Sequence, residues 1–221
     1  MSDSQKRLDN EPPHVPCDLL KASFDKILAL GALIVLLPIY LLIIVLIKVE
    51  GLLNPAARGP VIYHQMRISE GREFPLYKFR ITKNSVLNEE PSRHRRDRFK
   101  TLEQKQYCTV VGRYLKKWYL DELPQIFNIL RGEMSWVGPR PFPINDYEED
   151  LRRGLFQKKV IRAGLSGLTQ VHKGVKTMKT DVDLDSEYIS ACRAYSPPGR
   201  FRYDAEILLH TIHTVWAGKG L

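Results

Sequence analysis

The chain has 221 residues, of which 43% are hydrophobic and 10% aromatic, and its 34 basic against 25 acidic residues give a formal net charge of +9. This composition indicates a folded core and argues against wholesale disorder. The three cysteines include no CxxC pair, which disfavours both a zinc knuckle and a disulfide-stapled secreted domain.

Near the N-terminus, residues 27–47 form an uncharged apolar run, ILALGALIVLLPIYLLIIVLI. As a straight helix this run is about 31 Å long, close to the hydrocarbon thickness of a bilayer. A cleavable signal peptide is disfavoured because 26 residues precede the run and no small-residue cleavage site follows it. We therefore interpret residues 1–20 as a mobile leader and residues 21–50 as a membrane helix.

Pro38 lies inside this run and predicts a kink or break, because proline removes a backbone donor and clashes with the preceding turn. Two arrangements remain open: a kinked helix that spans the membrane, and a helix–break–helix hairpin that enters and leaves on one face. Basic residues flank both ends of the run, whereas a spanning helix normally has them in excess on its cytoplasmic side. This favours the hairpin without excluding the spanning helix.

The remaining residues, 51–221, predict a helix-rich α/β (α+β) domain. Gly59–Thr82 indicates a small β-hairpin that turns at Ser69-Glu70-Gly71, and residues 84–106 indicate a charged loop. Gly164 and Gly167 mark a further turn. Helices are predicted for Val110–Tyr119, from Pro124 to a stop at Gly132, for Ile144–Lys159 and for Tyr203–Trp216.

The first candidate site is the pair of adjacent carboxylates Asp121 and Glu122, directly before the predicted proline-started helix. The unpaired N–H groups and dipole of a helix N-terminus attract phosphate and lower the pKa of a carboxyl group. Asp121 can then stay ionised, as a nucleophile or a Mg²⁺ ligand requires. Arg113, Lys116 and Lys117 can offset the charge of a diphosphate. Acidic residues before a helix are also ordinary caps, and local spacing alone favours that alternative.

The second candidate site is Gly138-Pro139-Arg140-Pro141. Its two prolines fix the backbone around Arg140 and limit the entropy lost when the guanidinium binds an anion. A stiff surface turn is the alternative. In addition, Lys78-Phe79-Arg80 closes the predicted hairpin and either presents charge to a ligand or faces water.

Taken together, these segments resemble the bacterial sugar transferase family, whose members are monotopic phosphoglycosyl transferases that act on polyprenyl phosphate. The resemblance runs from Phe24 to Thr211 and is most specific at Val111–Pro141, VGRYLKKWYLDELPQIFNILRGEMSWVGPRP. Further matching segments are SFDKILAL, GPVIYHQMR, YKFR, GLSGLTQV, DSEY and DAEILLHT.

The resemblance implies a monotopic membrane protein at the bacterial inner (cytoplasmic) membrane. Its re-entrant helix is expected to break near Pro38, and amphipathic helices are expected at the lipid interface beside the small β-hairpin. Residues 51–221 are then a catalytic domain that faces the cytoplasm and contacts membrane lipids.

The resemblance also implies transfer of a sugar 1-phosphate from a nucleoside diphosphate sugar, with a UDP-sugar expected, to polyprenyl (undecaprenyl) phosphate. Asp121 attacks the sugar-bearing phosphate and nucleoside monophosphate leaves. The polyprenyl phosphate then attacks the phosphosugar-aspartyl intermediate. Mg²⁺ offsets charge on the phosphates. This reaction is the first membrane step in assembling an exopolysaccharide, capsule or O-antigen.

Residue roles follow from the same resemblance. Asp121 and Glu122 are the expected catalytic residues and Mg²⁺ ligands, with Glu122 as metal ligand or base. Arg140 is expected to contact the nucleotide or a phosphate, and Asp185 to lie on the metal side. The expected substrate-binding residues are Arg80, Arg113, Lys116, Pro139, Arg140 and Asp185.

Some positions depart from the usual family pattern. Lys116 stands where the family usually has Arg, Ala163 where it has Pro, and Gly174 near a position where an Arg is usual. These departures motivate an alternative function, a catalytically silent membrane scaffold of a glycan-assembly complex. The sugar, the nucleotide base and homo-oligomerisation stay open.

Nucleic-acid binding is a third hypothesis, suggested by the net charge of +9 and the run RHRRDRFK at Arg93–Lys100. Phosphate substrates and an anionic membrane surface explain the basic residues better. The sequence also carries no aromatic RNA-binding signature. We therefore expect no nucleic-acid partner.

Overall fold

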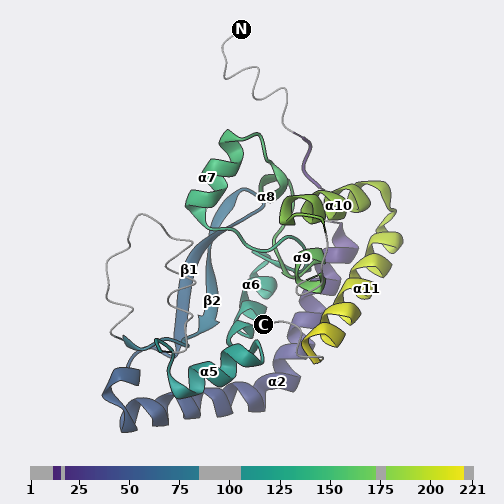
Figure 1. Cartoon of the computed structure of the whole chain (residues 1–221). Coiled ribbons are helices and arrows are strands. Elements are labelled where there is room, and N and C mark those ends of the chain that lie inside the picture. The colour runs from purple at the N-terminus through teal and green to yellow at the C-terminus, as the bar shows by residue number, and fades with distance from the viewer. Residues whose placement is uncertain (1–11, 16–17, 85–105, 173–177, 217–221) are drawn as a thin grey trace. The chain divides into compact units, whose positions relative to one another are not determined.

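The computed structural model describes residues 12–15, 18–84, 106–172 and 178–216 (Figure 1). It confirms the helix-rich α/β fold with its small β-hairpin. The strands are β1 (Ile62–Ser69), β2 (Arg72–Phe79), β3 (Ser135–Val137) and β4 (Gly164–Ser166). The α-helices are α2 (Leu19–Leu53), α5 (Val110–Lys117), α6 (Gln125–Arg131), α7 (Ile144–Arg152), α8 (Gln157–Val160), α9 (Leu168–Val171), α10 (Asp181–Ala194) and α11 (Pro197–Trp216), and the 3₁₀ turns are η1 (Pro55–Ala57) and η2 (Leu120–Glu122).

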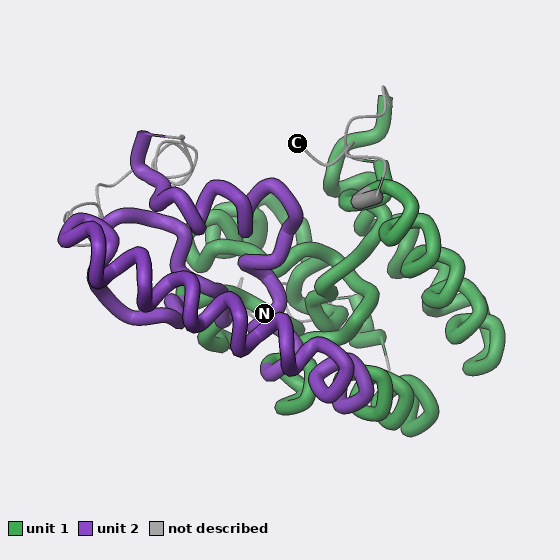
Figure 2. The backbone as a smooth tube through the Cα atoms, turned by 90° about the horizontal axis from the view of Figure 1, so that it is seen from below, with its two compact units in different colours: residues 1–29, 65–76, 128–221 green, residues 30–64, 77–127 purple. Residues whose placement is uncertain are grey.

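The chain forms two compact units (Figure 2). Unit 1 comprises residues 1–29, 65–76 and 128–221, and unit 2 comprises residues 30–64 and 77–127. One boundary between the two units therefore falls inside α2. The second half of α2 belongs to unit 2 because one of its faces packs into that unit's core.

Helix α2 is one helix of 35 residues, and its most apolar 18-residue window has a mean hydropathy of 3.1. Its length and composition suffice to cross a membrane. The break expected near Pro38 is not found, because helical structure continues through this residue. A proline removes a single helical hydrogen bond, and the packed residues that follow it keep the chain helical. A continuous helix leaves both membrane arrangements open.

Residues 12–15 of the predicted leader are among those that the structure describes. The backbone N–H of Val15 donates to the carbonyl of Val160 at 2.8 Å, and the Val15 side chain is buried. A tertiary hydrogen bond and apolar burial thus hold the chain at Val15, and the mobile leader over residues 1–20 stays a prediction. Residues 1–11 lie outside the described part.

The β1–β2 hairpin is confirmed. Its two turn residues, Glu70 and Gly71, have φ angles of 51° and 74°. Left-handed backbone at both positions is what a two-residue type I′ turn requires, and glycine adopts it without steric cost. Most of the charged loop predicted for residues 84–106 lies outside the described residues.

Unit 2 has a core in which the second half of α2 meets β2 and α5. Its buried apolar side chains are Tyr40, Ile43, Ile47, Phe79 and Leu115. Helix α5 starts at an N-cap, where the side chain of Thr109 accepts from the N–H of Gly112 at 2.9 Å. Predictions for α5 and α6 are confirmed to within two residues.

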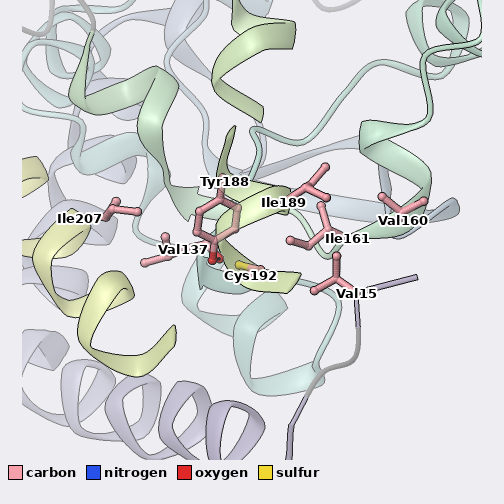
Figure 3. Packing of buried hydrophobic residues seen from close by; sticks show 8 residues of the cluster. All are labelled: Val15, Val137, Val160, Ile161, Tyr188, Ile189, Cys192 and Ile207. Atoms are coloured by element: carbon pink, nitrogen blue, oxygen red, sulfur yellow. Dashed lines mark hydrogen bonds between the residues drawn. The ribbon is translucent and has the colours of Figure 1, made fainter. Parts of the chain in front are cut away.

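Unit 1 contains helices α7–α11 and a parallel pair of strands, β3 and β4. In this pair, Ser135 lies opposite Gly164 and Val137 lies opposite Ser166. The prediction of a mere turn at Gly164–Gly167 is therefore wrong. A Cβ on Gly164 would lie 2.1 Å from the nitrogen of Gly138, so only glycine permits this approach. Figure 3 shows the core of this unit, formed by Val15, Val137, Val160, Ile161, Tyr188, Ile189, Cys192 and Ile207.

Two helix predictions in unit 1 also need correction. The single helix expected at Ile144–Lys159 is two helices, α7 and α8, because the chain turns at Gly154 with φ of 76°. Helix α10 was not predicted, and α11 starts at Pro197, six residues before the predicted start at Tyr203. Proline in the first turn of a helix costs little, since its missing N–H would have no helical partner there.

Candidate active site

The predicted dyad lies on a short turn between α5 and α6. Tyr119 precedes the turn with φ of 55°, a left-handed conformation that is strained in a non-glycine residue. The N–H of Glu122 then donates to the carbonyl of Tyr119 at 3.2 Å, and that of Leu123 to Leu120 at 3.3 Å. Both are i→i+3 bonds, which have poorer geometry than α-helical ones. The sequence thus places Asp121 and Glu122 on a tight and weakly bonded turn.

Lys78, near the end of β2, lies between the two carboxylates. Its Nζ is 2.7 Å from Oε1 of Glu122 and 3.9 Å from Oδ2 of Asp121. Asp121 is buried and Glu122 is half-buried. The positive charge of Lys78 offsets part of the negative charge of the two adjacent carboxylates. A buried aspartate beside a cation is chemically suited to attack an electrophilic phosphorus.

Sequence reasoning did not single out Lys78 as a functional residue. The only signal was its place in YKFR at the end of the hairpin, where it either presented charge or faced water. It lies 44 residues before Glu122 in the sequence, so no local pattern links the two. Their pairing depends on how β2 packs against η2.

Arg80, expected to bind substrate, is a structural residue. Its guanidinium donates to the carbonyls of Pro60, Thr82 and Ala57 at 2.7, 2.7 and 2.6 Å, and the residue is 2% exposed. Burial lowers the pKa of Arg80, and the nearby charge of Glu50 opposes that shift. Three of its N–H groups donate to backbone carbonyls, which gives Arg80 a structural role, and the substrate-binding role expected of it stays a prediction.

The other basic residues predicted for the site lie on α5, in the same unit as the dyad. Arg113 is exposed and Lys116 is half-buried in the last turn of the helix. Lys117 lies over the ring of Trp118, with its Nζ 5.4 Å from the ring centroid. Helix α5, which precedes the turn that bears Asp121, therefore carries three cations.

The remaining predicted site residues belong to unit 1. Pro139 is buried and Arg140 is exposed in the segment that follows β3. Asp185 is buried on α10 and forms an ion pair with Lys158. Burial raises the pKa of Asp185, and Lys158 opposes the rise. The structure thus gives Asp185 a lysine partner within its own unit, and its expected role toward substrate or metal stays a prediction.

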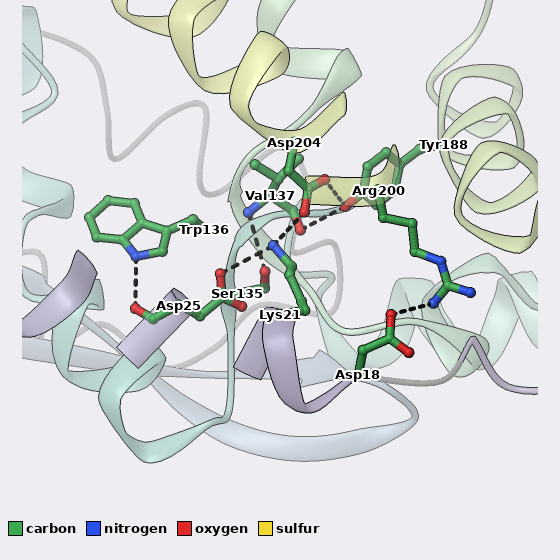
Figure 4. A network of polar contacts seen from close by, with 9 residues as sticks. All are labelled: Asp18, Lys21, Asp25, Ser135, Trp136, Val137, Tyr188, Arg200 and Asp204. Carbon is green, nitrogen blue, oxygen red and sulfur yellow. Dashed lines mark hydrogen bonds and ion pairs between the residues drawn. The ribbon is translucent and has the colours of Figure 1, made fainter. Parts of the chain in front are cut away.

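Unit 1 also holds a polar cluster that sequence reasoning missed. Figure 4 shows Lys21 of α2 between Asp25 and Asp204, with its Nζ 3.1 and 2.6 Å from their carboxylate oxygens. The hydroxyl of Tyr188 donates to Asp204 at 2.7 Å, and the indole N–H of Trp136 donates to the backbone carbonyl of Asp25 at 3.0 Å. Burial raises the pKa of Asp204, and Lys21 opposes the rise. The cluster borders a cavity of about 50 Å³, too small for a nucleotide.

The departure at Ala163 has a structural explanation. Its backbone N–H donates to the hydroxyl of Ser69 at 3.0 Å, a bond that proline cannot make. Its carbonyl accepts from the N–H of Ser135 at 2.8 Å. Alanine at this position therefore adds a tie between the hairpin and the β3–β4 sheet, and it does not by itself indicate a lost activity.

The donor set of the dyad limits what metal it can hold. Within the described part of the chain, no group of three or more His, Cys, Asp or Glu side chains converges as a metal site. Two adjacent carboxylates suit Mg²⁺, which binds through one or two carboxylates together with substrate phosphates. The two carboxylates therefore fit an ion that takes further ligands from a bound diphosphate.

Comparison with known proteins places the chain in a family. A sequence profile described as bacterial sugar transferase matches residues 17–218. The chain is 34% identical over 212 residues to the exopolysaccharide production protein ExoY of Rhizobium meliloti, covering 91% of this chain and 88% of that protein.

Two further relatives are longer proteins. Identity is 37% over 182 residues to the UDP-glucose:undecaprenyl-phosphate glucose-1-phosphate transferase of Xanthomonas campestris pv. campestris, covering 76% of this chain and 34% of that protein. It is 32% over 192 residues to the undecaprenyl-phosphate galactose phosphotransferase of Salmonella typhimurium, covering 81% of this chain and 37% of that protein. The chain thus spans about a third of the length of these two relatives. On the profile match and these identities, the chain belongs to the bacterial sugar transferase family.

Proposed function

We propose that this protein transfers a sugar 1-phosphate from a nucleoside diphosphate sugar, with a UDP-sugar as the expected donor, to undecaprenyl phosphate. The observation that carries the proposal is the buried Asp121 on its strained turn, beside the Lys78–Glu122 ion pair. The names of two relatives, which specify undecaprenyl-phosphate sugar-phosphate transfer, support the reaction class.

The reaction proceeds in two displacements at one phosphorus. A carboxylate oxygen of Asp121 attacks the sugar-bearing phosphate of the donor and forms a P–O bond. The bond from this phosphorus to the bridging oxygen breaks, and nucleoside monophosphate leaves with the electron pair. An oxygen of undecaprenyl phosphate then attacks the same phosphorus, and the bond to Asp121 breaks. The products are a lipid-linked diphosphate sugar and the restored carboxylate.

The neighbouring residues prepare this attack. Lys78 holds Glu122 at 2.7 Å and keeps positive charge near the developing negative charge of the phosphate oxygens. Arg113 and Lys116 contribute further positive charge from α5, and we assign Arg140 to the nucleotide or a phosphate. Asp121 and Glu122 are the residues that would hold Mg²⁺, which when bound supplies charge stabilisation on the phosphates.

For the membrane arrangement we propose the re-entrant form at the bacterial inner membrane, with the catalytic residues facing the cytoplasm. Beyond Pro38, α2 buries one face in the unit 2 core, through Tyr40, Ile43 and Ile47. Its other face is apolar and exposed, as at Leu42 and Val45. One-sided burial supports a helix half embedded in lipid, since a spanning helix would meet lipid on most sides.

Labelling of single cysteines distinguishes the two arrangements. We would replace Ser23, before the apolar run, and Asn54, after it, with cysteine in a background that lacks native cysteines. In sealed inverted membrane vesicles, the re-entrant form predicts that both sites react with an impermeant maleimide. A spanning helix would protect one of the two sites until the vesicles are opened with detergent.

Release of nucleoside monophosphate in nanodiscs tests the proposed activity. The assay contains undecaprenyl phosphate, Mg²⁺ and a panel of nucleoside diphosphate sugars. We expect release with one donor, in an amount that depends on the lipid acceptor under multiple turnover. No release from any donor by folded, membrane-bound protein would contradict the proposal and favour the silent scaffold. Release without lipid acceptor under multiple turnover would indicate hydrolysis instead of transfer.

A further inference from the structure

The membrane helix contacts the catalytic turn directly. Tyr40 follows Pro38 by two residues, in the middle of the apolar run. Its hydroxyl donates to the carbonyl of Leu123 at 2.5 Å, and the residue is 5% exposed. Its ring packs against Phe79 and Phe127, with centroid separations of 5.6 and 6.2 Å. A polar bond thus joins the centre of α2 to the residue after the dyad.

The turn depends on such a contact because its own bonds are weak. The carbonyl of Leu123 also accepts from the N–H of Ile126 at 3.0 Å, and the N–H of Phe127 donates to Pro124 at 3.1 Å. Like the bonds inside η2, both are i→i+3 bonds. With Tyr119 strained at the start of the turn, tertiary contacts must hold the backbone in place. The hydroxyl of Tyr40 is such a contact at the end of the turn.

Helix α2 also contacts the start of the segment that leads into the turn. The carboxylate of Glu50 accepts from the backbone N–H groups of Val110 and Val111, at 2.6 and 3.0 Å. These are the first residues of α5, so Glu50 caps that helix. Helix α2 therefore holds the segment at both ends. Glu50 contacts the first residues of α5, and Tyr40 contacts the residue that follows η2.

We propose that Tyr40 is a positioning residue for the nucleophile, acting through the carbonyl of Leu123, so that α2 is part of the active-site scaffold. This inference rests on the proposed function of Asp121. The hydroxyl sets where the turn sits, while the ring supplies apolar packing to the core of unit 2. Because Tyr40 bonds to the backbone of the turn, its loss should alter the attack geometry more than donor binding.

Tyr40→Phe isolates the hydroxyl, because phenylalanine keeps the ring that packs on Phe79 and Phe127. The carbonyl of Leu123 keeps its bond to Ile126, so no buried acceptor is left without a donor and the variant should fold. Small displacements of reacting groups reduce turnover strongly. We therefore expect a rate of monophosphate release about tenfold lower, with the donor KM within about twofold of wild type.

The experiment follows the first half-reaction of the full chain in nanodiscs, with the donor and Mg²⁺ but without undecaprenyl phosphate. The burst amplitude reports the fraction of competent enzyme, and the burst rate reports the geometry of attack. The matched control is Tyr114→Phe, which removes an exposed hydroxyl from α5 in the same unit. We expect Tyr40→Phe to lower the rate with wild-type amplitude and thermal stability, and Tyr114→Phe to change neither quantity.

Other outcomes decide against the proposal. A burst rate equal to wild type shows that the hydroxyl does not position the nucleophile. An amplitude that falls together with the thermal midpoint, at an unchanged rate, makes Tyr40 a stability residue only. If the wild type is active, either of these results overturns this inference and leaves the proposed function standing. Wild type that releases monophosphate only when undecaprenyl phosphate is present overturns the aspartyl intermediate and this inference with it. Wild type that releases none in either assay overturns the proposed function as well.

Discussion

Both units contain a lysine between two carboxylates, and the two arrangements differ in how tightly they are built. Lys78 of unit 2 lies 2.7 Å from Glu122 but 3.9 Å from Asp121. Lys21 of unit 1 lies within 3.1 Å of both Asp25 and Asp204. The first pair of carboxylates occupies one strained turn, whereas the second pair comes from two different helices, α2 and α11.

This difference teaches that the same charges can serve reaction or architecture. Around Lys21, Tyr188 and Trp136 add hydrogen bonds, so the cluster ties the start of α2 to α10, α11 and β3. Around Lys78, the contact to Asp121 exceeds hydrogen-bond distance. Under the proposed function, Lys78 keeps positive charge near the reacting carboxylate, whereas Lys21 joins helices.

The largest effect is expected at the nucleophile. Asp121→Asn should lower monophosphate release at least about 10³-fold, because an amide cannot form the aspartyl phosphate. Membrane association and thermal stability should stay near wild type. The control is Glu206→Gln, an exposed carboxylate that pairs with Arg202 on α11, which should keep full activity. Activity that survives in Asp121→Asn would refute the role assigned to the dyad.

The next largest effect is expected at Lys21 and concerns stability. Lys21→Met leaves Asp25 and Asp204 buried without their cation, which should lower the free energy of unfolding by about 3–5 kcal/mol. Thermal unfolding in detergent micelles measures this loss. Lys26→Met, an exposed lysine one turn further along α2, should change the midpoint little. Equal midpoints for the two variants would show that the Lys21 cluster is not structural.

Lys78→Gln should act on turnover and leave the fold nearly intact. Removing the charge beside Glu122 is expected to slow monophosphate release about 10²-fold, as loss of one preorganised charged donor typically does. Lys78→Arg keeps the charge and should recover part of the rate, although the guanidinium has a different shape. Steady-state kinetics checks both variants. A loss of stability as large as that of Lys21→Met would remove the contrast between the two lysines.

The smallest effect is expected at Asp185 and depends on pH. Burial raises the pKa of this carboxyl above its ordinary 3.8. The native state therefore binds more protons than the unfolded state in the window above that value, and stability from this group falls as pH rises through the window. Asparagine does not titrate. The wild-type advantage over Asp185→Asn should thus shrink between acidic and neutral pH, as measured by thermal unfolding at each pH.

A widening of that advantage with rising pH would instead show that Lys158 dominates and lowers the pKa of Asp185. The direction of the change therefore separates burial from ion pairing.

The partners of charged residues were the features that sequence reasoning placed least well. Arg80 was expected at the substrate and binds three backbone carbonyls. Lys78 was not singled out, although it forms an ion pair with the dyad. The Lys21 cluster and the parallel pairing of β3 with β4 were also missed. Most of these contacts join residues that are distant in the sequence.

By itself, the sequence determined the long apolar helix, the hairpin turn at Glu70-Gly71, helices α5 and α6, and the adjacency of Asp121 to Glu122. These features depend on hydropathy, turn chemistry and spacing within a few residues, so a local pattern is sufficient to predict them. Only the tertiary structure decided that helical structure continues through Pro38 and that Tyr40 bonds to the residue after the Asp121–Glu122 turn. The physical reason is that a backbone preference is local, whereas the partner of a buried polar group depends on which distant segments pack around it.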